Sequence, residues 1–212
     1  ETVTATIAPQ LMVAENERVK GKPPESLAAW ELVIRFQPLF WRMNHTDLLE
    51  AQKLLRGAIE HDPDYAQAHA LLGFSYIWHA WMGWGDDPRS LIPKAEPEAR
   101  RALELDDQEP WAYMAMSAVH GYARRHEESV RDLRRALDLN PNFSFGYAWL
   151  GTLLGYAGKV DEANEMIDQA YRISPKDPFN SMLPGLRAIG LFTASRDAEA
   201  LEHARESLRM RP

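Results

Sequence analysis

Two nearly identical octets, RRALELDD at residues 100–107 and RRALDLNP at residues 134–141, begin 34 residues apart. Two complete blocks of this length follow one another without a gap, at residues 108–141 and 142–175. Inside each block, apolar residues recur at steps of three and four residues in two runs that a short turn separates, which is typical of amphipathic helices. Self-similarity at this period predicts a series of helical hairpins.

Three further copies of the block are less regular, at residues 28–63, 66–107 and 178–212. The first copy has a long first helix that contains Pro38. The second holds about ten additional residues, WMGWGDDPRSLIP among them, which we expect to lengthen or bend its hairpin. The third has three additional residues in its first helix. The period therefore predicts an all-α array of about five repeats over residues 25–212.

The block YAWLGTLLGYAGKVDEANEMIDQAYRISP has an aromatic residue, Leu-Gly, two alanines and a closing proline at Tyr147, Leu150, Gly151, Ala163, Ala170 and Pro175. The preceding block carries Tyr113, Met116, Ser117, Ala136 and Pro141 at the same places, with Ser129 where an alanine is expected. In these positions the chain resembles the tetratricopeptide repeat (TPR). The resemblance implies a TPR-type helical-hairpin solenoid, a right-handed superhelix of stacked hairpins with one continuous core.

The same resemblance implies that the first helix of each hairpin faces the concave side of the array. The residues at the groove positions are mostly aromatic or aliphatic, and none is charged: Phe74, Ile77, Trp78, Trp111, Met114, Tyr122, Phe145, Thr152, Tyr156, Phe179, Met182 and Ile189. None is a Lys, Asn or Arg, the residues with which chaperone-binding members of the family grip a peptide carboxylate. An exposed apolar surface usually marks an interaction site. We expect a protein or peptide with an apolar segment, or a second copy of the chain, to bind there.

An alternative for these twelve positions stays open from the sequence. Aromatic residues at helical spacing are commonly core residues, and in a short array some of them would pack against the next helix. The sequence alone does not separate an open groove from a filled one.

The composition excludes several classes of partner. Asp and Glu total 31 against 24 Lys and Arg, and the resulting net charge of −7 repels nucleic-acid phosphates and anionic lipid. The chain has no cysteine, which excludes disulfides and thiolate metal sites. Residues 65–85 carry no charged side chain, but polar residues interrupt this stretch and the repeat accounts for it. We expect no nucleic-acid partner, no membrane segment and a cytoplasmic location.

The sequence shows no constellation typical of catalysis. The seven histidines are scattered, with no His-Glu-x-x-His motif. There is no glycine-rich phosphate loop and no Gly-x-Ser-x-Gly elbow. Acidic residues at the starts of second helices favour the helix dipole and need no acid–base role. No catalytic, cofactor-binding or metal-binding residue is predicted, and we expect this segment not to be an enzyme.

The beginning of the chain suggests a larger context. ETVTATIAPQL, followed by KPPESLAAWELVIRFQPLFWR, is similar to the junction of bacterial signalling proteins in which a class III adenylate or guanylate cyclase domain, or a winged-helix DNA-binding domain, precedes a TolB-like segment and a TPR array. The resemblance implies that residues 1–24 are an N-terminal helix and linker from a preceding domain. The metal-binding aspartates of a cyclase have no counterpart motif here.

Two functions follow from this interpretation. The preferred one is a non-catalytic protein-interaction module, the partner-binding or oligomerisation arm of a bacterial signalling protein. The alternative is a cis-regulatory, autoinhibitory module that restrains a cyclase or a DNA-binding transcription regulator.

Overall fold

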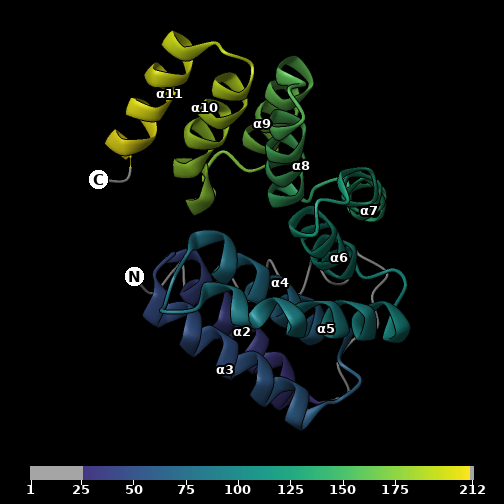
Figure 1. The fold of residues 1–212 in the computed structure, drawn as a ribbon. Coiled ribbons are helices and arrows are strands. Elements are labelled where there is room, and N and C mark those ends of the chain that lie inside the picture. Colours follow the sequence, from purple (N-terminus) through teal and green to yellow (C-terminus); the bar gives the residue numbers. More distant parts are fainter. Residues whose placement is uncertain (1–25, 211–212) are drawn as a thin grey trace. The chain divides into compact units, whose positions relative to one another are not determined.

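The computed structural model describes residues 26–210, and within this range every regular element is a helix. The predicted N-terminal helix at residues 1–24 lies outside the described residues. Figure 1 shows the order of the helices along the chain. The elements are α2 (Leu27–Trp41), α3 (His45–His61), α4 (Ala66–Met82), the short 3-10 helix η1 (Pro88–Leu91), α5 (Ile92–Leu105), α6 (Pro110–Tyr122), α7 (His126–Leu139), α8 (Ser144–Tyr156), α9 (Val160–Ile173), the short 3-10 helix η2 (Pro178–Met182), α10 (Leu183–Thr193) and α11 (Asp197–Met210).

The described helices confirm the predicted all-α class, and four of the consecutive helix pairs pack as hairpins. Helices α2 and α3, α4 and α5, α8 and α9, and α10 and α11 pack against each other as consecutive pairs. Helices α6 and α7 fall in the predicted repeat at residues 108–141. The chain divides after Arg125 into two compact units, which are described separately below. The repeat boundaries and the hand of the superhelix stay predictions.

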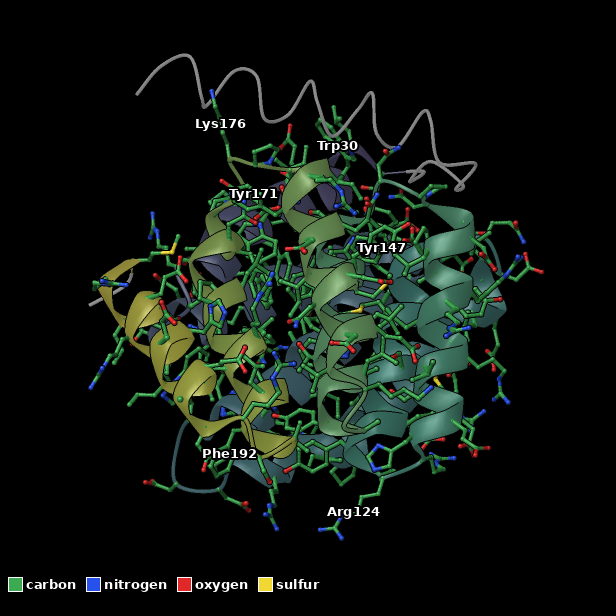
Figure 2. The ribbon with its side chains drawn as sticks, turned by 90° about the horizontal axis from the view of Figure 1, so that it is seen from above. Trp30, Arg124, Tyr147, Tyr171, Lys176 and Phe192 are labelled. Atoms are coloured by element: carbon green, nitrogen blue, oxygen red, sulfur yellow. The ribbon has the colours of Figure 1, made fainter. Side chains whose placement is uncertain are left out.

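The turn that follows each of α6, α8 and α10 has one conformation. Its central residue has a positive φ, at Arg124 (60°), Gly158 (75°) and Ser195 (59°) (Arg124 is labelled in Figure 2). In each case the N–H of the following residue donates to the carbonyl oxygen five positions earlier, at 2.9 Å. This left-handed turn satisfies a carbonyl at the end of the first helix. These turn residues lie 34 and 37 positions apart along the chain. The two offsets align α6–α7, α8–α9 and α10–α11 with one another in the sequence.

The additional residues of the irregular copies form short 3-10 helices or lengthen a first helix. In the second hairpin, α4 has 17 residues, whereas α6 and α8 have 13 each. The chain then turns at Gly83, whose φ is 68°, and forms η1 before α5 begins. In the last hairpin the additional residues form η2, directly before α10. The predicted lengthening of the second hairpin is confirmed.

Glycines stand where helix backbones approach each other most closely. A Cβ atom added at Gly151 in α8 would lie 2.8 Å from the carbonyl oxygen of Ala163 and 2.7 Å from Cγ1 of Ile167, both in α9. A Cβ added at Gly155 would lie 3.0 Å from the Cα atom of Gly190 in α10. Backbone atoms cannot rotate away as side chains can. The small residues that the repeat requires therefore set the distance between helices.

We predict opposite effects for two glycine-to-alanine substitutions. Gly151→Ala should lower the free energy of unfolding by about 1–3 kcal/mol, because the new methyl group meets the α9 backbone. Gly57→Ala in α3 is the matched control: its Cβ would meet only Leu32 Cδ1, at 3.4 Å. The control should raise the free energy of unfolding by up to about 1 kcal/mol, because alanine has a higher helix propensity than glycine. Urea denaturation of both variants measures this, and equal effects would contradict the assigned contact.

Candidate interaction site

The structure divides the twelve predicted groove residues by burial. Seven are buried: Phe74, Ile77, Trp78, Met114, Phe145, Thr152 and Phe179. Five are partly or largely accessible: Trp111, Tyr122, Tyr156, Met182 and Ile189. Tyr156 is the most open of these, with 47% of its surface exposed. The set does not form one continuous accessible lining within either unit.

In the first unit, ring contacts join α2, α4 and α6. The ring centroid of Phe40 in α2 lies 5.4 Å from that of Trp78 and 6.0 Å from that of Phe74, both in α4. Phe74 in turn contacts Trp111 of α6, edge to face, at 5.7 Å. Helix axes in contact are about 8–10 Å apart, a distance that aromatic side chains can bridge. Phe74 and Trp78 are therefore core residues in this structure, which is one of the two alternatives that the sequence left open.

The second unit repeats this packing between α8 and the segment that leads into α10. The rings of Phe145 and Phe179 meet edge to face at 4.7 Å, a favourable geometry for aromatic pairs. Thr152 is also buried, and its hydroxyl group donates to the carbonyl oxygen of Ala148 at 2.9 Å. Its polar group is thus used within its own helix. Phe145 and Phe179 stabilise the packing between hairpins, and none of the three residues lines an open surface.

We predict that two aromatic residues of the second unit respond differently to substitution. Phe145→Ala should cost about 3–5 kcal/mol of unfolding free energy, because it removes a buried ring. Tyr156→Arg should change it by only about half a kcal/mol, because the tyrosine is exposed. Thermal denaturation of the two variants compares them. A large loss of stability for Tyr156→Arg would contradict its placement on the surface.

Little space is left among the aromatic side chains of the first unit. The small cavity that Phe36, Phe40, Leu71 and Trp111 line with their neighbours has a volume of about 20 Å³. That volume holds about one water molecule. A peptide chain does not fit there without a change in the packing of α2, α4 and α6.

A larger opening lies between α5 and α6 of the same unit. This cleft has a volume of about 620 Å³. Its lining residues are Ile92, Pro93, Glu96, Pro97, Arg100, Arg101, Glu104, Val119, Tyr122, Ala123 and Arg125. Of the predicted groove residues, only Tyr122 is among them. At about 620 Å³ the cleft is spacious enough to hold side chains of a partner, and we take it as the candidate site of the first unit.

The apolar part of the cleft depends on two prolines of α5. Pro93 is at the start of the helix and Pro97 is inside it. Because Pro97 has no N–H, it cannot donate to the carbonyl of Pro93 as a regular helical residue would. The proline rings share the lining of the cleft with Val119 and Tyr122 of α6. The sequence did not predict this wall, because both prolines lie in α5, the second helix of its hairpin. The groove positions of the repeat are all in first helices.

The charged residues at the cleft are largely paired with one another. Arg100 donates to a carboxylate oxygen of Glu96 at 2.6 and 3.0 Å, and this bond lowers the pKa of Glu96. Arg101 lies 2.7 Å from Asp64 and 3.6 Å from Glu104. Paired side chains offer less to a charged ligand than unpaired ones do. The apolar wall is therefore the more distinctive feature of the cleft.

A buried acid caps the helix that forms one wall of the cleft. Glu109 is the N-cap of α6, and its carboxylate accepts a hydrogen bond from the backbone N–H of Trp111 at 2.9 Å. Burial, with a smaller contribution from the neighbouring Asp106, raises the pKa of Glu109 from 4.5 to about 7, although the hydrogen bond from Trp111 acts to lower it. Burial likewise raises the pKa of Tyr65, with Glu109 contributing. Sequence reasoning did not single out Glu109.

The raised pKa of Glu109 predicts that stability falls with rising pH. Because the folded protein holds this proton more tightly than the unfolded chain, the stabilisation is complete below pH 4.5 and is lost as the pH rises through 7. Between about pH 5 and pH 8 the loss should be about 2 kcal/mol. Glu109→Gln cannot ionise and keeps an oxygen for the Trp111 N–H, so it should remove most of this dependence. Urea denaturation across the pH range measures both proteins, and parallel pH profiles would contradict the prediction.

Residues 26–210 offer neither a metal site nor a membrane-spanning helix. That range contains no group of three or more His, Asp or Glu side chains placed to hold a metal ion. None of its helices has the length and apolar character needed to cross a membrane.

The paired helices with small residues at their contacts are those of a TPR fold, and solved structures support this. A thermophilic TPR protein of Thermus thermophilus is 17% identical, with a TM-score of 0.66 over 87% of this chain and 92% of that chain. PilF of Pseudomonas aeruginosa is 20% identical, with a TM-score of 0.56 over 87% and 77% of the two chains. YrrB, described as a TPR protein with an unusual peptide-binding site, is 17% identical, with a TM-score of 0.50 over 85% of each chain.

The chain therefore has the TPR fold. No family model matches it. Among curated proteins it is similar to one named "Putative adenylate cyclase 3", from Rhizobium meliloti (strain 1021). The two are 26% identical over 128 residues, which is 60% of this chain. The matching segment spans 22% of the length of that relative.

Proposed function

We propose that this chain is a non-catalytic protein-interaction module that binds an apolar segment of a partner protein in the cleft between α5 and α6. The observation that carries the proposal is the open cleft itself, about 620 Å³ in volume, in a unit whose aromatic helix contacts are filled. Pockets that bind ligands commonly have volumes in this range. The wall of Pro93, Pro97, Val119 and Tyr122 suits an aliphatic or aromatic side chain.

The resemblance to a cyclase supports a role within a signalling protein. The relative named as an adenylate cyclase is much longer than the matching segment, which spans 22% of it. We propose that this module is one arm of a bacterial signalling protein, in which a separate domain carries a cyclase activity. A cytoplasmic location is part of the same proposal. The relative's name favours a cyclase over a DNA-binding output domain.

Peptide selection tests the proposed site with a matched pair of variants. Immobilised protein would select from a displayed library of random peptides, and the selected peptides would then be titrated against Tyr122→Arg and Tyr156→Arg. These tyrosines occupy the same position in consecutive repeats, 34 residues apart. Only Tyr122 lines the cleft, so only its substitution should weaken binding, by tenfold or more.

The other results of this titration contradict the proposal. A loss confined to Tyr156→Arg would place binding on the second unit, and equal affinity of all three proteins would remove the cleft from consideration. Circular dichroism confirms that both variants are folded before binding is compared.

A further inference from the structure

One cation at the cleft between α5 and α6 lacks a carboxylate partner. Arg125, in the turn that follows α6, is among the residues that line the cleft. The pKa of Glu96 on α5 is lowered mainly by its hydrogen bond with Arg100, and the charge of Arg125 lowers it further. The Arg125 guanidinium group therefore lies close enough to the α5 wall to act on it. Among residues 26–210, no carboxylate forms an ion pair with Arg125.

The later turns show how the cation at this position is used elsewhere. Lys159 and Arg196 follow the residue with positive φ in their turns, as Arg125 does. The ammonium nitrogen of Lys159 lies 3.4 Å from a carboxylate oxygen of Glu162. The guanidinium group of Arg196 lies 2.7 Å from a carboxylate oxygen of Glu199. Those two cations are used within their own hairpins, whereas Arg125 lines the cleft and is available to a ligand.

Pro97 provides a hydrogen-bond acceptor on the opposite wall. Because it has no N–H, the backbone carbonyl group of Pro93 lacks the donor that a regular helix would supply. Both prolines line the cleft, so this carbonyl group lies on the same wall. A carbonyl group without its helical donor can accept a hydrogen bond from the backbone of another chain. A bound peptide can therefore donate an N–H to α5 and place an acidic side chain at Arg125.

The charges at the cleft favour an anionic ligand group over a cationic one. The carboxylate groups of Glu96 and Glu104 lie 2.6 and 3.6 Å from the guanidinium groups of Arg100 and Arg101. A cationic ligand group would have to compete with these two arginines, whereas an anionic group would meet Arg125 unpaired. The chain as a whole carries a net charge of −7 and repels anions. A preference for an acidic ligand would therefore have to arise at the cleft itself.

We infer that the cleft recognises a peptide segment in which an Asp or Glu lies within two residues of an apolar residue. This inference rests on the proposed function, because the apolar side chain packs on the same wall of Pro97, Val119 and Tyr122. The carboxylate group pairs with Arg125, and a backbone N–H of the segment donates to the carbonyl oxygen of Pro93. Arg125 then determines which apolar segments bind.

Binding of three peptide pools to the immobilised full chain tests this inference. Each pool has a central leucine among random uncharged residues, and one position within two residues of the leucine is fixed as Glu, Gln or Lys. At low salt the Glu pool should be retained about threefold more than the Gln pool, the scale expected of an exposed ion pair. The Lys pool should be retained least, although the net charge of the chain would attract it. Added salt should reduce the difference between the Glu and Gln pools.

Two charge reversals locate the effect. Arg125→Glu should reverse the order of the Glu and Lys pools, because the cleft would then present an unpaired carboxylate. Arg124→Glu is the matched control: it changes the net charge by the same amount, but Arg124 is exposed and does not line the cleft. The control should keep the original order. Circular dichroism establishes that both variants are folded.

The Gln pool reports on the proposed function separately. Its retention depends on the apolar wall, so Tyr122→Arg should abolish it. If the Gln pool binds in this way and the Glu pool binds no better, the inference is overturned and the proposed function stands. If the two charge reversals have equal effects, the preference comes from overall charge and the inference is likewise overturned. A Gln pool that is not retained, or whose retention Tyr122→Arg leaves unchanged, contradicts the proposed function and the inference with it.

Discussion

The close approach of helix backbones at glycine determines much of this structure. Where Gly155 of α8 meets Gly190 of α10, an added methyl group would be crowded, at 3.0 Å from the opposing Cα atom. At Gly151 the carbonyl oxygen of Ala163 occupies that space. Helices held this close leave limited room between neighbouring hairpins, and the aromatic side chains that point into it become buried. The fold therefore combines small residues at the crossing points with large rings beside them.

This arrangement changes where a partner can bind. In each unit, rings of consecutive repeats contact one another, as Phe74 does with Trp111 and Phe145 with Phe179. The interlocked rings stabilise the hairpins but occupy the surface that a peptide would need. Open apolar surface lies instead at the proline-containing wall of α5 and on the last hairpin. Both are places where the chain departs from the regular repeat.

The sequence predicted the helices better than it predicted the site, for a physical reason. Apolar spacing shows which side of a helix faces other helices, and the 34-residue period showed how the helices pair. Neither shows whether a neighbouring side chain covers a given residue. Phe40 illustrates this: it lies in the least regular copy of the repeat, and it packs against Trp78. The cleft depends on Pro93 and Pro97, which no groove position includes.

Tryptophan accessibility tests the central claim, that the aromatic residues of the first helices form core packing. Fluorine-labelled tryptophan can be followed by NMR while a soluble paramagnetic agent is added, with each signal assigned by a Trp→Phe variant. Trp78 and Trp149 are buried, whereas Trp30 is partly exposed. The account predicts strong broadening of the Trp30 signal and little broadening of the signals of Trp78 and Trp149. Broadening of Trp78 equal to that of Trp30 would show an open groove and would contradict the account.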